Sequence, residues 1–270
     1  MSALAIPLPR HRESGRRPIG APLALIGVAA AIGVWWLITL LFADRPLVGE
    51  FTPARTFTGL TELAASGTLV DASAVSIFRL LVGIGLAAAV GVVIGFAVGS
   101  IDWLERASSP VLLFLRMVSP LSWAPIAILA FGIGAPPVVA LVMAAAVWPV
   151  QVATAEGVRR IEPGHRLVAH ALGATGWEVA RHVVIPALRP SVLVGLRQAI
   201  GIGWVVLVPA EMLGVTSGLG YQIMNAKDQL AYHHITALII VIGALGFALD
   251  VLARWAFASR RERAADRQPA

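Results

Sequence analysis

The sequence contains no cysteine among its 270 residues, and it carries few charged side chains. Without cysteine, neither a disulfide framework nor a thiolate metal site can form. Charged residues make up 13% of the chain, against roughly 25% in soluble globular proteins, whereas hydrophobic residues make up 58%. This composition predicts an integral membrane protein.

The sequence signatures of catalysis and of nucleotide binding are also missing. No stretch matches GxxxxGK[ST], the phosphate-binding loop, so we expect that this chain does not bind ATP itself. Ser119 and Ser122 have no activating base nearby in the sequence, which argues against serine hydrolysis. His165, His170 and His182 lack clear metal-ligand spacing. We therefore expect no enzyme, no metal site and no cofactor on this chain.

The net charge of +6 does not predict a nucleic-acid partner. The basic residues flank apolar stretches and do not form one soluble patch, so they are better interpreted as signals of membrane topology. With the N-terminus inside and about six helices alternating, the two tails, a short polar turn at Asp102–Arg106 and the polar stretch after the fourth span are cytoplasmic, and they hold most of the arginines. Both termini are then expected to be cytoplasmic, with membrane lipid around the apolar spans.

Apolar runs of spanning length predict an all-α protein with about six transmembrane helices. Gly91, Gly95 and Gly99 in the second run have the spacing that lets helices approach closely, and packing within the chain is favoured over a dimer contact. Prolines 110, 120 and 125 should break the third run. The predicted spans are 22–43, 73–101, 108–131, 138–155, 191–213 and 235–257.

The spans divide the chain into four parts. Residues 1–20 form a basic cytoplasmic tail, and residues 21–72 hold the first helix and an outer loop with a short helix at 56–65. Residues 73–258 form the core membrane domain, with a second polar outer loop at 214–234. Residues 259–270 form a second cytoplasmic tail.

A polar segment, residues 167–190, interrupts the apolar pattern between the fourth and fifth spans. Thr175 followed by Glu178 is a capping box, which predicts the start of a helix. Gly173 stands where a preceding short helix, from about residue 163, would need a left-handed residue to end, and Pro186 is expected to end the second helix. The polar segment is therefore predicted to be two short helices hinged at Gly173–Ala174 that contact a soluble partner.

The order of motifs resembles the permease subunits of binding-protein-dependent ATP-binding cassette (ABC) importers of the nitrate, sulfonate and taurine type. In the polar segment, Gly and Pro fall at that family's spacing, although Leu167 and Val168 replace its Glu-Ala. Further resembling stretches are Phe78–Gly83, Ser119–Pro125, Phe131–Gly134, Gly195–Arg197, Gly203–Trp204, Ala210–Met212, Gly218–Tyr221 and Leu249–Asp250.

The resemblance implies a type I importer fold in a bacterial plasma (inner) membrane. It also implies a permease dimer, an external solute-binding protein and two cytoplasmic ATPase subunits that bind ATP. The polar segment lies in what would be the coupling loop, residues 159–190, which docks on the ATPase. Its expected coupling residues are Ala169, Gly173, Ala174, Thr175, Trp177, Glu178, Arg181 and Pro186.

Ionisable residues inside spans are costly and need a partner or a water-filled cavity. They are Arg79, Arg116, Arg197, Glu211 and Asp250, and pairing of an arginine with Glu211 is as plausible as a transport role. Arg116 could contact a passing anion, pair with an acidic neighbour or extend to the cytoplasmic surface. The candidate pathway residues are Arg116, Ser119, Ser122, Trp123, Glu211 and Met212.

Two hypotheses remain open at this point. The first is the importer permease, carrying a small anion such as nitrate, a sulfonate or taurine. The alternative is a self-powered secondary transporter or a membrane-embedded enzyme, which should show an Asp/Glu/His relay or a serine or metal site within the spans. The sequence does not specify the solute, nor whether two permease chains of a dimer are identical.

Overall fold

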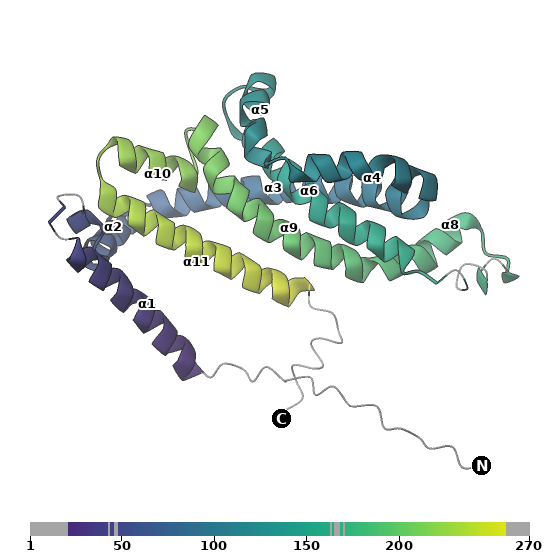
Figure 1. The fold of residues 1–270 in the computed structure, drawn as a ribbon, viewed down its shortest axis with the longest axis horizontal. Coiled ribbons are helices and arrows are strands. Elements are labelled where there is room, and N and C mark those ends of the chain that lie inside the picture. Colours follow the sequence, from purple (N-terminus) through teal and green to yellow (C-terminus); the bar gives the residue numbers. More distant parts are fainter. Residues whose placement is uncertain are drawn as a thin grey trace, which may run out of the picture. The chain divides into compact units, whose positions relative to one another are not determined.

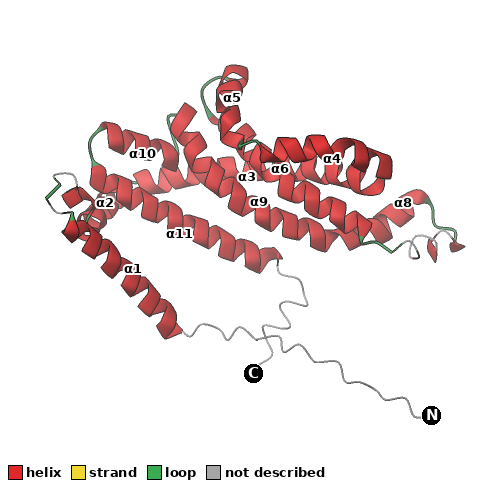
Figure 2. Cartoon of the chain, viewed as in Figure 1, coloured by secondary structure: helices red, strands yellow, loops and turns green. Residues whose placement is uncertain are grey.

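The computed structural model describes residues 21–42, 44–45, 48–162, 164, 168–169 and 171–257. Every regular element in that part of the chain is a helix, as Figure 2 shows. The chain forms two compact units, residues 1–55 and 56–270, and each is described by itself. In the smaller unit, α1 (Ala21–Leu41) is followed by the short η1 (Val48–Phe51), and the Trp35 indole N–H donates to the Phe51 carbonyl at 3.0 Å.

The larger unit contains four helical runs that are long and apolar enough to cross a membrane. They are α3 (Thr68–Ser100), α6 (Ala135–Arg159), the continuous run Gly176–Gly214 and α11 (Tyr232–Phe257). A fifth span is broken: α4 (Asp102–Met117) meets η2 (Pro120–Trp123) and α5 (Ala124–Phe131) at 87°. With the shorter apolar helix at Leu25–Leu41, this arrangement agrees with about six spans and with a proline-broken third span.

The core lies where α3, α6 and α9 (Ile185–Gly214) pack side by side, as Figure 1 shows. Leu80, Val142 and Leu207 are fully buried there. A Cβ added at Gly91 would lie 2.9 Å from the Val147 carbonyl oxygen of α6, and one at Gly99 would lie 2.8 Å from that of Ala155. The glycine row of α3 therefore lets α6 pack closely against it, which confirms packing within the chain.

The larger unit begins at Thr56, whereas the sequence placed the start of the core at residue 73. The reason is α2 (Pro53–Ala65), whose residues Thr56, Gly59 and Leu63 are buried. Leu63 joins the hydrophobic core, and a Cβ at Gly59 would lie 2.9 Å from the His233 carbonyl oxygen. This short helix, predicted at 56–65, is packed against the start of α11.

Two local predictions were wrong. The polar residues Asp102–Arg106 do not form a turn but begin α4, because the extended residue Ile101 makes the break and the acidic residues suit the positive end of a helix. Pro186 does not end a helix. It lies in the first turn of α9, directly after a wide π-helical turn, η3 (Ala180–Val184), where a missing N–H costs less than in a helix interior.

Candidate functional sites: the polar segment, the broken helix and a buried ion pair

The capping box of the polar segment is present at the start of α8 (Gly176–Val179). The Thr175 backbone N–H donates to Glu178 Oε2 at 2.7 Å, and the Glu178 N–H donates to Thr175 Oγ1 at 3.4 Å. The backbone N–H of Thr175 lowers the pKa of Glu178, because it stabilises the ionised carboxylate. The prediction of a helix start at Thr175 is confirmed.

The hinge before this helix has the geometry that the sequence predicts. Gly173 has a φ of +84°, a region that favours glycine, and the Ala174 N–H donates to the Ala169 carbonyl at 3.0 Å. A Cβ at Gly173 would meet no atom within 4 Å, so a larger residue would be strained only through its backbone. The expected start of the preceding helix near residue 163 lies outside the described residues.

The polar segment has one packed face and one exposed face. Val179 is buried in a small cluster with Val158 of α6, Val184 and Leu188, and Ala169 and Ala174 pack against that cluster. By contrast, Leu172 is 83% exposed and Trp177 is 70% exposed, and Arg181 and Pro186 are exposed as well. The packed face fixes the segment on the ends of α6 and α9, which leaves an apolar surface open to a partner.

The broken span separates the expected pathway residues into two groups. Arg116, near the end of α4, lines a cavity of about 160 Å³ together with Ser109, Trp148 and Gln151. A Glu105–Arg159 ion pair of 2.8 Å contributes to the same cavity wall. Ser119, Ser122 and Trp123 lie at or beyond the bend and are exposed, but they do not line this cavity.

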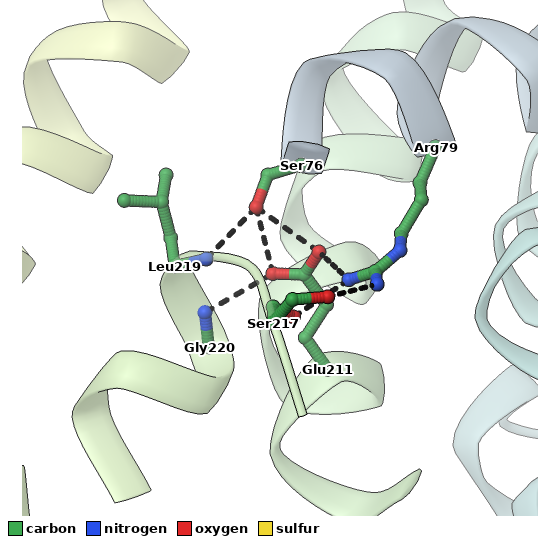
Figure 3. Close-up of polar contacts among 6 residues, drawn as sticks. All are labelled: Ser76, Arg79, Glu211, Ser217, Leu219 and Gly220. Atoms are coloured by element: carbon green, nitrogen blue, oxygen red, sulfur yellow. Dashed lines mark hydrogen bonds and ion pairs between the residues drawn. The ribbon is translucent and has the colours of Figure 1, made fainter. Parts of the chain in front are cut away.

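A buried ion pair joins α3 to the end of α9 (Figure 3). The Arg79 guanidinium donates to Glu211 Oε1 at 2.7 Å, and Ser76 donates to the same carboxylate, at 2.8 Å to Oε2. Arg79 is 4% exposed and Glu211 is fully buried. The pairing of an arginine with Glu211 is thus confirmed, and the arginine is Arg79.

The loop after α9 completes the cluster. Arg79 also donates to the Ser217 carbonyl and to the Ser217 hydroxyl, each at 2.7 Å, and the Gly220 N–H of α10 (Leu219–Asp228) donates to Glu211 Oε2 at 3.1 Å. Gly218 has a φ of +101°, and a Cβ there would lie 2.5 Å from the Glu211 carboxyl carbon. The carboxylate is therefore enclosed by donors and by a close backbone, as a buried charge requires.

The remaining predicted ionisable residues are placed differently. Asp250 forms an ion pair with Arg254 one turn along α11, and Arg197 is exposed on α9. Met212 is half-buried beside Glu211. Sequence reasoning missed Ser76 and Ser217 as partners of the ion pair, although the Gly218–Tyr221 stretch pointed to this loop.

Comparison with known proteins decides the class. Residues 87–262 match the family described as binding-protein-dependent transport system inner membrane component. The chain belongs to this family. The permease is 33% identical over 264 residues to the bicarbonate transport system permease protein CmpB of Synechococcus elongatus, covering 90% of this chain and 94% of that one. It is 30% identical over 248 residues to the taurine transport system permease protein TauC of Escherichia coli, covering 89% and 90%.

The fold has a solved counterpart. A chain from inward-facing conformations of the MetNI methionine ABC transporter covers 67% of the permease and 92% of itself, with a TM-score of 0.50 at 17% identity. The permease therefore has the type I ABC importer permease fold, as predicted, and it is a multi-pass inner-membrane transport subunit. Family membership favours the importer over the alternative of a self-powered transporter or a membrane enzyme.

Proposed function

We propose that the permease forms the path for a small anion and couples that path, through the polar segment, to a separate ATPase that binds and hydrolyses ATP. An external solute-binding protein delivers the anion, and a second permease chain completes the path. The observation that carries the coupling role is the exposed apolar pair Leu172 and Trp177, held on a segment whose other face is packed. A rigid segment with an exposed tryptophan suits docking, because such residues supply much of the binding free energy of interfaces.

Two observations support an anionic solute. The relatives named above are permeases for bicarbonate and for taurine, which both carry an acid group. Arg116 lines a cavity in the broken span, and no acidic partner is found for it within the described part of the chain. A guanidinium stays charged and offers several donors, so it can take the place of water around an anion as it passes.

The proposed topology places the polar segment and both termini in the cytoplasm. Most arginines lie in the tails and on the side of the polar segment, as the positive-inside rule requires.

We assign the surface that contacts the second permease chain to α4. None of the residues of α4 is buried, and Val111, Phe114 and Met117 are 57%, 68% and 72% exposed. An identical chain that packs against these exposed apolar side chains would cover them.

The coupling role is tested on the complex of permease, ATPase and binding protein in lipid nanodiscs. Trp177→Ala should abolish most of the ATPase stimulation by loaded binding protein, because loss of an anchoring tryptophan costs about 2 kcal/mol or more of docking free energy. Gly173→Val should act in the same direction through backbone strain at the hinge.

The matched control is Phe247→Ala on α11, because Phe247 is 72% exposed and Trp177 is 70% exposed. Phe247→Ala should leave the stimulation close to that of the unmodified complex. Normal stimulation in both Trp177→Ala and Gly173→Val would refute the assignment of the polar segment as the docking element.

A further inference from the structure

Three potential metal ligands converge at the junction of α2 and α11. His234 Nε2 lies 2.8 Å from Glu62 Oε2, and His233 Nε2 lies 3.4 Å from the same oxygen. The two imidazole rings are 4.3 Å apart between centroids and tilted by 51°. One ligand atom from each of the three residues falls within 4.8 Å of the other two. Glu62 is 171 residues away from His233 in sequence, so only the fold brings them together.

These distances suit a tetrahedral divalent ion. Zinc binds imidazole nitrogen and carboxylate oxygen at about 2.0–2.2 Å, which places neighbouring tetrahedral ligands about 3.3 Å apart. The Glu62–His233 separation of 3.4 Å already has that value, and the Glu62–His234 contact needs to open by about half an ångström. Two imidazoles and one carboxylate form a known zinc ligand set that leaves a fourth position open.

The surroundings are compatible with an ion at this position. Glu62 and His234 line a cavity of about 320 Å³, and Ser66, Gln222 and Asn225 line it as well. An ion and a water molecule can therefore reach these two ligands. The histidine side chains are 22% exposed and Glu62 is 52% exposed.

The scaffold behind the ligands is tightly packed. Gly59 lies so close to the start of α11 that an added Cβ would be 2.9 Å from the His233 carbonyl oxygen, and Leu63, next to Glu62, is part of the core. Backbone positions that are fixed in this way bring the ligands together at a low entropic cost. We propose that Glu62, His233 and His234 bind one divalent transition-metal ion, of which zinc is the best fit, and that the ion joins α2 to α11 at the outer face of the permease.

The alternative to a metal site is that Glu62 only accepts hydrogen bonds from the two histidines. The test uses the purified full-length permease in nanodiscs, without an affinity tag that contains histidine, so that metal binding is measured apart from transport. Zinc is titrated by calorimetry and counted by elemental analysis, and cobalt is used as a spectroscopic probe of tetrahedral coordination. The unmodified permease should bind one ion per chain and give the visible absorption of tetrahedral cobalt.

His233→Ala with His234→Ala should remove the bound ion, and Glu62→Gln should weaken zinc binding by about 100-fold or more, because it removes a ligand and its charge. The control is His182→Ala, since His182 lies on the polar segment, where its ring contacts the Glu178 carbonyl. The control should bind zinc like the unmodified chain. Equal binding in the double histidine variant, or no bound ion in the unmodified permease, would overturn the proposal. Transport results do not enter this test, so it stands or falls separately from the proposed function.

Discussion

Arg79 and Arg116 both lie within membrane-spanning helices of the permease, but their surroundings are opposite in kind. Arg79 is 4% exposed, and it donates to the Glu211 carboxylate and to both oxygens of Ser217. Arg116 is exposed in a cavity of the broken span. Within the described residues, no ion pair is found for Arg116. Both terminal nitrogens of the Arg79 guanidinium are bound by the protein itself, whereas Arg116 keeps its donors available.

The difference teaches that the residue type alone does not decide the role of an intramembrane charge. A buried guanidinium stays charged even when it loses its carboxylate, and an unpaired buried charge costs several kcal/mol, so Arg79 is tied to the stability of the fold. A guanidinium in a cavity retains water until an anion replaces it, so Arg116 can serve transport with little consequence for stability.

The largest expected effect follows removal of the partner of Arg79. Glu211→Ala should destabilise the permease by about 3–5 kcal/mol, because it leaves a buried charge without its counter-ion. Thermal unfolding in nanodiscs and yield of assembled complex measure this. The matched control is Arg79→Met combined with Glu211→Leu, which removes both charges and should restore much of the lost stability. Equal stability of Glu211→Ala and the unmodified chain would show that the Arg79–Glu211 ion pair does not stabilise the fold.

A smaller effect, on transport alone, is expected at Arg116. Arg116→Gln should reduce anion uptake about tenfold or more, because a charge-assisted hydrogen bond is worth about 1.5–3 kcal/mol. The complex should still assemble, and its unfolding temperature should stay near that of the unmodified protein. Arg116→Lys, which keeps the charge, should recover part of the uptake. Uptake at the unmodified level in a stable Arg116→Gln complex would show that Arg116 has no role in transport.

The smallest effect is expected at Ser217. Ser217→Ala removes the hydroxyl that accepts from Arg79 but leaves the backbone carbonyl that accepts from the same guanidinium. The loss should therefore be about 1 kcal/mol, the usual net worth of one hydrogen bond. Thr61→Ala, which removes an exposed hydroxyl on α2, should change the unfolding temperature less. A loss as large as that of Glu211→Ala would mean that the loop, rather than the ion pair, holds the cluster together.

Sequence reasoning succeeded where the signal is local. The apolar runs located the spans, and the pairing of Thr175 with Glu178 located a helix start, because both depend on neighbouring residues. It gave pairing of an arginine with Glu211 equal weight with a transport role, and it could not choose among Arg79, Arg116 and Arg197. The bond from Arg79 crosses 132 residues, and only the packing of α3 against α9 decides it.

The errors also have physical causes. The sequence predicted a helix end at Pro186 because a proline inside a regular helix removes a hydrogen bond. Nothing in the sequence indicates the π-helical turn that precedes Pro186. The convergence of Glu62 with His233 and His234 was missed for a related reason. Its members lie on α2 and α11, which are far apart in the sequence and come together where Gly59 approaches the His233 backbone.

The continuous run from Gly176 to Gly214 has a mechanical consequence. It contains 39 residues, so at about 1.5 Å per residue it is a rod of about 58 Å that begins in the polar segment and carries Glu211 near its far end. In the proposed coupling, a push from an ATPase docked at Trp177 would pass along this one helical run to the anchored Glu211 carboxylate. Pro190 and Pro209 each remove one backbone hydrogen-bond donor from this run, so we expect bending under load to concentrate there and at the π-helical turn η3, which lies within the same run.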